Sequence, residues 1–162
     1  MNILCHPNPA LKQHADDVER FDQRDLKSLV AAMAKTMYDA PGVGLAATQV
    51  GVMSRVMVYD IDDGLVALSN PRIVDSSEET ELSEEGCLSL PGIEVPIARS
   101  VSLTCEALDI DGNPVTIEAH GLLARVIQHE IDHLDGILII DRATPEERKA
   151  AIQRYNEVAR TT

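Results

Sequence analysis

The residues best suited to chemistry in this sequence lie in the segment His129–His133, which reads His-Glu-Ile-Asp-His. If this segment is helical, the two histidines project from one face with their side chains about 5–6 Å apart. Two imidazoles so placed are suitable ligands for a zinc-type ion, and a carboxylate such as that of Glu130 can activate a water molecule beside it. The pattern predicts a metal-dependent hydrolase, and the alternative is a chance pair of surface or core histidines on an ordinary helix.

The flanking sequence favours a helix, because apolar residues recur at helical intervals before and through the motif. These residues are Leu122, Leu123, Val126, Ile127, Ile131 and Leu134. Gly136 lies where a left-handed helix C-cap is expected, and the apolar run from Ile137 to Ile140 then predicts a strand. We therefore expect the motif on the last turns of a largely buried helix.

A catalytic site of this type uses three protein ligands, so the histidine pair needs a third. Metzincin proteases take a later histidine, but that position is Ile139 here, and Glu157 is a poor counterpart of the thermolysin-type glutamate because it is expected to be exposed. Cys87, in a tight loop within Glu84–Gly92, is the better candidate because thiolate binds zinc and ferrous iron strongly. On its own, such a cysteine is more often a packing residue.

A glycine-rich segment, Gly42–Gln49, is the third unusual feature. Pro41 and Gly42 stop a preceding helix, and the two glycines allow the backbone to approach a ligand closely. The segment lacks the lysine of a phosphate-binding loop and the spacing of a dinucleotide fingerprint. Taken alone, it indicates only a loop.

Together these segments resemble the three signature motifs of peptide deformylases. Gly42–Gln49, Glu85–Ser89 and Gln128–Leu134 occur in the family's order, and the resemblance extends from about Ile3 to the terminal helix. It implies a metal-dependent hydrolase that removes the N-terminal formyl group from formyl-methionine of newly made polypeptides and releases formate. The alternatives are another metal-dependent amidase or peptidase that uses the same ligands, and a non-catalytic relative.

The resemblance also implies roles for individual residues. The metal ligands are Cys87, His129 and His133. Glu130 is the general acid and base, while the side-chain amide of Gln49 and the backbone N–H of Leu88 stabilise the developing oxyanion. One divalent ion is implied, with Fe²⁺ expected in the cell and Zn²⁺, Ni²⁺ or Co²⁺ as alternatives in purified protein.

For the substrate, the resemblance implies an N-formyl-methionyl peptide that pairs with backbone as an added strand and inserts its methionine into an apolar pocket. The residues assigned to substrate binding are Val43, Gly44, Gly86, Leu122 and Val126, with Leu88 also placed in the pocket. Glu85 and Arg99 are expected to pair and to hold a metal-bound histidine in place. A solvated surface salt bridge is the alternative for this pair.

Charge and targeting signals restrict the partners and the compartment. Acidic residues outnumber basic ones 27 to 14, for a net charge of −13, which opposes general attraction to nucleic acid or anionic membranes. The three cysteines suggest no disulfide framework, and neither a signal peptide nor an apolar run of about 18 residues is present. We expect a cytoplasmic protein, with Arg148, Lys149, Arg154 and Arg160 of the terminal helix available for transient ribosome contact or simply forming a solvated face.

The elements that must position these residues indicate an α+β fold. A helix is predicted over Asp25–Tyr38, and strands are predicted over Val52–Ile61, Leu65–Ser69, Val101–Leu108 and Pro114–Ala119. We expect antiparallel or mixed sheets packed around a central helix that carries the His-Glu-x-x-His motif, with one helix before it and one at the C-terminus. The length of 162 residues predicts a single catalytic domain over residues 1–162.

Overall fold

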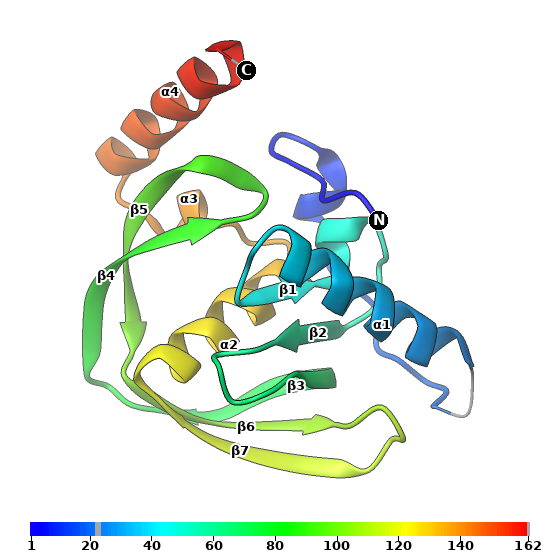
Figure 1. Cartoon of the computed structure of the whole chain (residues 1–162). Helices are drawn as coiled ribbons and strands as arrows, with labels where there is room; N and C mark the ends of the chain where they lie inside the picture. The colour runs from blue at the N-terminus through cyan, green and yellow to red at the C-terminus, as the bar shows by residue number, and fades with distance from the viewer. Residues whose placement is uncertain (22–23, 162) are drawn as a thin grey trace.

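A five-stranded antiparallel sheet lies between two helices in the computed structural model, which describes residues 1–21 and 24–161 (Figure 1). The strand order is β1-β2-β3-β6-β7. The bounds are β1 Gly44–Ala46, β2 Val56–Tyr59, β3 Val66–Ser76, β6 Ser102–Leu108 and β7 Pro114–His120. Helix α1, Arg24–Asp39, packs on β1 and β2, and helix α2, Gly121–Leu134, crosses the opposite face.

The alternation of side chains along β2 explains how this short strand packs against both helices. In β2, Val56 and Val58 belong to the cluster under α1, whereas Met57 and Tyr59 belong to the cluster under α2. Successive side chains of a strand point to opposite faces, and all four of these residues are buried. The sheet is therefore a buried layer that fixes α2 relative to the N-terminal part of the chain.

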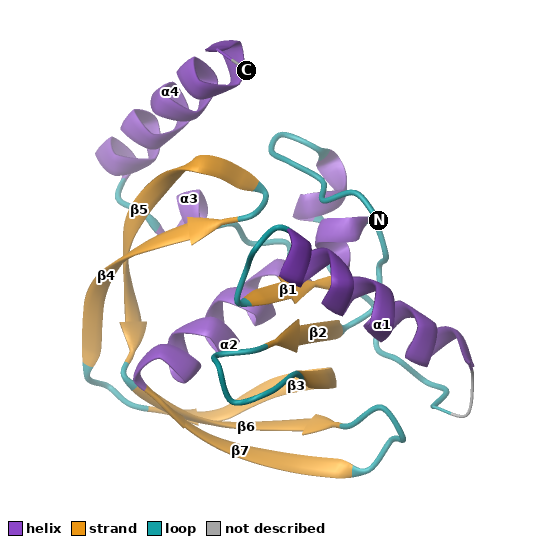
Figure 2. Ribbon diagram, viewed as in Figure 1, coloured by secondary structure: helices purple, strands orange, loops and turns teal. Residues whose placement is uncertain are grey.

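A second, two-stranded sheet lies beside α2 and supplies the other wall of the molecule (Figure 2). It is the hairpin of β4, Thr80–Cys87, and β5, Leu90–Ser100. Its buried face packs against the 3₁₀ helix η1 (Pro9–Lys12), α3 (Ile139–Arg142) and α4 (Pro145–Thr161). Cys87 is therefore the last residue of a strand, not part of a loop between extended segments.

The predicted α+β class with a central helix and two flanking helices is confirmed, and the helix predicted over Asp25–Tyr38 is α1. The strand predicted over Ile137–Ile140 is wrong, because this run enters α3. Asp141 accepts the Leu138 N–H at 2.9 Å and starts the helix, while the apolar side chains pack under β5. None of the described helices is both long and apolar enough to cross a bilayer.

Candidate metal centre

The C-terminal end of α2 is held firmly where it carries the two histidines. The helix ends at Leu134, and Gly136 follows in the expected left-handed conformation, with φ +77°, and donates to the His133 carbonyl at 3.1 Å. The Thr48 hydroxyl donates to the same carbonyl at 3.1 Å, and Arg55 Nη1 donates to the Leu134 carbonyl at 3.0 Å. These contacts provide partners for carbonyl groups of the last turn, which have none within the helix, and they fix the position of His133.

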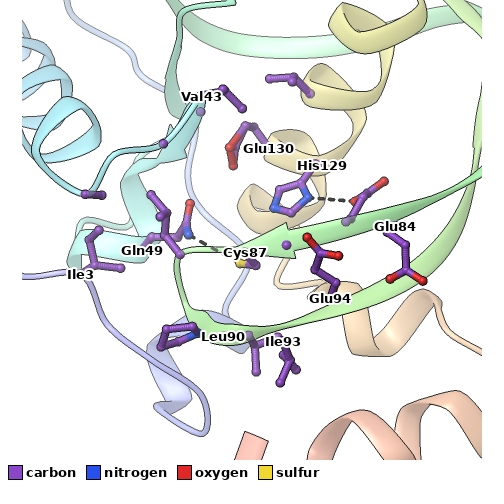
Figure 3. Close-up of a pocket in the computed structure, with 18 of the residues that line it drawn as sticks. Ile3, Val43, Gln49, Glu84, Cys87, Leu90, Ile93, Glu94, His129 and Glu130 are labelled. Carbon is purple, nitrogen blue, oxygen red and sulfur yellow. Dashed lines mark hydrogen bonds and ion pairs between the residues drawn. The ribbon is translucent and has the colours of Figure 1, made fainter. Parts of the chain in front are cut away.

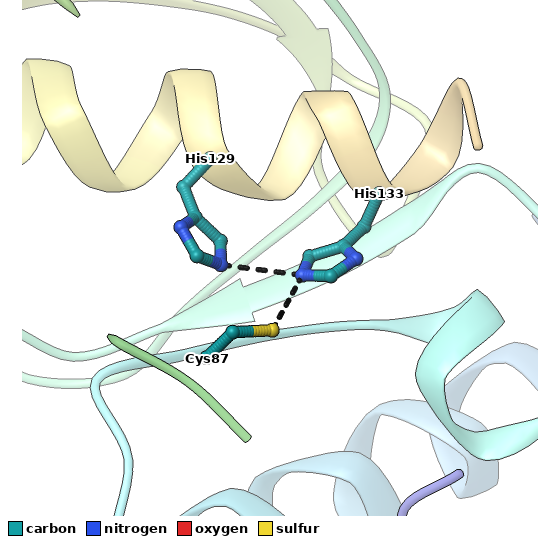
Figure 4. Close-up of side chains that lie close together, drawn as sticks. All are labelled: Cys87, His129 and His133. Atoms are coloured by element: carbon teal, nitrogen blue, oxygen red, sulfur yellow. Dashed lines mark hydrogen bonds between the residues drawn. The ribbon is translucent and has the colours of Figure 1, made fainter. Parts of the chain in front are cut away.

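Cys87, His129 and His133 converge on one point, with their ligand atoms within 4.8 Å of one another (Figure 4). The Nε2 atoms of the two histidines are 3.2 Å apart, and Cys87 Sγ lies 3.3 Å from His133 Nε2. Because Glu85 Oε1 lies 2.9 Å from His129 Nδ1, we infer that the proton of this ring sits on Nδ1 and that Nε2 presents a lone pair. The arrangement of one sulfur and two imidazole nitrogens suits a tetrahedral divalent ion with one position left open.

The electrostatics of the cluster favour bound positive charge. Burial acts to lower the pKa of His129, but hydrogen bonds to Cys87 and Glu85 outweigh it and raise the pKa well above its ordinary value. Burial lowers the pKa of His133 well below its ordinary value, so that ring stays neutral. The acceptors that favour a proton on His129 would equally favour a divalent ion in its place, and His133 is already in the neutral state that metal binding requires, so the residues present fit a metal ion.

Glu85 is the centre of a buried ion network that orients His129. It accepts from Arg99 Nε at 2.9 Å and Arg99 Nη2 at 3.0 Å, and from Arg125 Nη1 at 2.5 Å. Burial acts to raise the pKa of Glu85, but hydrogen bonds from His129 and Arg99 lower it to about 2. The Glu85–Arg99 pair is thus buried, with both side chains 5% exposed, and is not a solvated surface salt bridge.

The sequence reasoning missed three members of this network. Asp132, inside the motif itself, accepts from Arg99 Nη1 at 2.6 Å and from Arg142 Nη2 at 2.8 Å. Arg125 stands one helical turn before His129, a spacing that does place two side chains on one face. The four-residue spacing from Arg125 to His129 could therefore have identified Arg125 from the sequence. The ion pair from Arg142 in α3 to Asp132 depends on the tertiary fold and could not.

Glu130 is buried beside the cluster, at 2% exposure, and its Oε1 has no hydrogen-bond partner among the described residues. Burial raises the pKa of Glu130 to about 7, although the nearby His129 opposes this. Gly44 lies directly against it, since a Cβ added at Gly44 would sit 2.7 Å from Glu130 Oε2. The glycine is required for this close approach, and the carboxylate is poised to exchange a proton near neutral pH.

Gln49 and Leu88 line the same cleft as Cys87 and His129. Gln49 is 1% exposed, and its Oε1 accepts the Ala46 N–H at 3.0 Å. Its Nε2 approaches Cys87 Sγ at 3.9 Å (Figure 3). Leu88 follows Cys87 in the turn between β4 and β5 and lines the same cleft.

The cleft that contains the cluster is lined by every residue predicted to bind substrate. These residues are Val43, Gly44, Gly86, Leu122 and Val126. Val126 is buried, whereas Val43 and Leu122 are exposed to 51% and 58%, so Leu122 is not an ordinary core residue. β1 and β4 are each at the edge of a sheet and flank this cleft, which leaves backbone edges available on both sides.

The family model for polypeptide deformylase matches residues 1–149 of the chain. Among curated proteins, a peptide deformylase of Acidothermus cellulolyticus is 47% identical over 155 residues, which cover 96% of this chain and 85% of that protein.

Two solved structures extend the comparison to the fold. A peptide deformylase from Legionella pneumophila superposes with a TM-score of 0.93 at 42% identity, covering 99% of this chain and 95% of that chain. The peptide deformylase from Thermotoga maritima gives a TM-score of 0.86 at 46% identity, covering 89% and 97% of the two chains. At these identities the likeness extends beyond the fold to the family.

Proposed function

Because this chain belongs to the peptide deformylase family, we propose that Cys87, His129 and His133 bind its divalent metal ion beside Glu130 as the general base. The enzyme hydrolyses the formyl amide at the N-terminus of newly made polypeptides. The observation that carries the assignment is the convergence of the three ligand atoms within 4.8 Å next to an unpartnered, buried carboxylate oxygen. A divalent ion held there supplies Lewis acidity and lowers the pKa of water towards ~7.

Glu130 performs the proton transfers. Its carboxylate faces the cleft, and its pKa of about 7 allows it to accept a proton from the attacking water and to return one to the leaving amine. The unpartnered Oε1 is the atom available for this exchange. Such general acid–base catalysis contributes typically about 10²–10⁴-fold in rate.

Gln49 and Leu88 stabilise the negative charge that develops on the formyl oxygen. A side-chain N–H of Gln49, whose Nε2 lies 3.9 Å from Cys87 Sγ, and the backbone N–H of Leu88, the residue after Cys87, act as the donors. Donors fixed before the reaction need no reorganisation when the charge appears, and removal of one typically costs about 10²–10³-fold in turnover.

The substrate peptide lies as an added strand between the edges of β1 and β4, with Val43, Gly44 and Gly86 as its backbone partners. Backbone pairing accepts varied sequences, which suits an enzyme that acts on many nascent chains. Selectivity comes from the methionine side chain, which contacts Val43, Leu88, Leu122 and Val126. Glu85 and Arg99 contribute indirectly, by holding the His129 ring in its ligating orientation.

We propose that the ion in the cell is Fe²⁺, with Zn²⁺, Ni²⁺ or Co²⁺ able to replace it in purified protein. One thiolate and two imidazoles accept all four ions, so availability decides occupancy. Cys5, Cys87 and Cys105 form no disulfides with one another, and a thiolate ligand is sensitive to oxidation. These features support a reducing compartment, the cytoplasm, where formylated chains emerge from ribosomes.

The whole chain, residues 1–162, is proposed to act as one catalytic domain, with α4 making transient contact with the ribosome. Of its basic residues, Arg148 pairs with Asp141 and Arg154 donates to the Glu94 carbonyl. Lys149 and Arg160 are exposed and offer charge for such contact, whereas the overall charge of −13 opposes direct nucleic-acid specificity. Ribosome co-sedimentation of the K149E/R160E variant beside the native protein tests this, and equal sedimentation would contradict it.

The assignment is tested by purifying the protein without oxygen, measuring its metal content and following formate release from a formyl-methionyl peptide. Native protein should contain iron and release formate, while Glu130→Ala should keep its metal and lose nearly all activity. Cleavage of internal peptide bonds in place of formate release would favour a different metal-dependent peptidase. Metal-loaded protein without either activity would indicate a non-catalytic relative.

A further inference from the structure

We propose that Ser89 is a positioning residue for Gln49, holding one N–H of its amide so that the other points at the reacting carbonyl oxygen. The inference rests on the role proposed above for Gln49. It arises from a buried hydroxyl that neither the metal ligands nor the general base uses.

The Gln49 amide is held at both ends. Its Oε1 accepts the Ala46 N–H at 3.0 Å, and its Nε2 donates to the Ser89 hydroxyl oxygen at 3.0 Å. A primary amide has two N–H groups, so one remains after the bond to Ser89. The 3.9 Å approach of Nε2 to Cys87 Sγ shows that the amide nitrogen borders the ligand cluster, where the reacting carbonyl must lie.

Ser89 is itself fixed, which allows it to fix another residue. It is 0% exposed in the turn between β4 and β5. Its backbone N–H donates to Cys87 Sγ at 3.4 Å, and its carbonyl accepts the His6 N–H at 2.9 Å. The hydroxyl therefore joins the oxyanion donor on the glycine-rich segment to the turn that carries the metal ligand Cys87.

Without this acceptor, the Gln49 amide is held only at Oε1, by the bond from the Ala46 N–H, so its Nε2 end can shift. The Nε2 group then has the Cys87 sulfur as its neighbouring acceptor, in competition with the substrate. Misplacement of a catalytic group by about 1 Å can lower the rate up to ~10²-fold. Because loosening the Gln49 amide is a milder change than removing it, we expect Ser89→Ala to lower kcat about 10-fold. KM should change little, because the lost interaction belongs to the transition state.

A double-mutant cycle on the metal-loaded enzyme tests the proposal. Formate release is measured for the native protein, Ser89→Ala, Gln49→Ala and the double variant, with the metal content of each determined. Ser89→Ala should lower kcat about 10-fold in the native background and have almost no effect when Gln49 is already alanine. Ser83→Ala, on the exposed part of β4, is the matched control and should match the native enzyme.

An equal loss of kcat in both backgrounds, or a loss of metal from Ser89→Ala, would overturn the proposal, because Ser89 would then act through Cys87 or through folding. Native kcat in Ser89→Ala would overturn it as well. Native kcat in Gln49→Ala would instead refute the role proposed for Gln49. If Ser89→Ala does not fold, Ser89→Gly removes the same hydroxyl and completes the cycle.

Discussion

Replacing Glu85 by glutamine should weaken metal binding although residue 85 touches no metal ligand atom. In the native protein Oε1 accepts from His129 Nδ1 at 2.9 Å and from Arg99 Nη2 at 3.0 Å, and Oε2 accepts from Arg99 Nε at 2.9 Å and from Arg125 Nη1 at 2.5 Å. A glutamine at this position can present an acceptor to only one of these two groups of donors. Its NH₂ must face the other group.

The competition between these donors sets the size of the effect. If the amide oxygen turns to Arg125, the NH₂ meets His129 Nδ1 and favours the ring tautomer with its proton on Nε2, which cannot bind metal. Loss of such an orienting partner typically weakens metal affinity about 10- to 100-fold, or roughly 1.4–2.7 kcal/mol. Breaking a buried ion pair costs about 3–5 kcal/mol, but Arg99 keeps Asp132 at 2.6 Å, so the loss of folding stability should be smaller.

The assay is competition for the metal by a chelator of known affinity, followed by kcat at saturating metal. Glu84→Gln is the matched control, because it removes the neighbouring but exposed carboxylate and should bind metal normally. Native affinity in folded Glu85→Gln would refute the reasoning, since it would mean that His129 needs no acceptor at Nδ1. A large loss of metal affinity in Glu84→Gln would mean that the change in net charge alone causes the effect.

Three further predictions concern other parts of the chain. Gly44→Ala should lower kcat at least about 10-fold in the formate assay, because its Cβ would lie 2.7 Å from Glu130 Oε2 and must displace the general base. Burial acts to raise the pKa of Asp141, but a hydrogen bond from Lys12 helps to lower it overall. The ionised carboxylate therefore stabilises the fold at pH values above its unfolded pKa of ~3.9. That stabilisation is lost as the pH falls through the lower pKa of the folded state. The urea midpoints of native protein and Asp141→Asn should therefore converge below about pH 4. Gly136→Ala should reduce the free energy of unfolding by about 1–3 kcal/mol in a thermal or urea melt, because φ is +77° and the added Cβ would lie 2.5 Å from the Lys12 carbonyl.

The parts of the site that follow from local pattern were predictable. The His-Glu-x-x-His spacing specifies one helix face, and the apolar periodicity around it correctly placed the motif on the last turns of α2. Gly136 was likewise expected after that helix and has positive φ. These features depend on a few consecutive residues, so the sequence alone contains the information.

Other features depend on contacts between distant segments. The first five residues of β4 are exposed, including Glu81 and Glu84, yet the same strand buries Glu85 against Arg99 and Arg125. A carboxylate paired with two arginines is stable in the interior, but only the tertiary fold brings those groups together. Similarly, the apolar run at Ile137–Ile140 had no period to distinguish a strand from a short helix.

The alternation of β4 explains how three consecutive residues contribute to three parts of the site. Glu85 and Cys87 point to the buried face, where one orients His129 and the other approaches His133. Gly86, between them, faces the cleft edge, and a Cβ there would meet only the Ile93 carbonyl at 3.8 Å. The register shift between Gly86 and Cys87 then turns the chain sharply, so that the next two residues can present a backbone donor and the Ser89 hydroxyl. An insertion of one residue before Cys87 would move the thiol to the opposite face, and we infer that the spacing from Glu85 to Ser89 is as essential as the residues themselves.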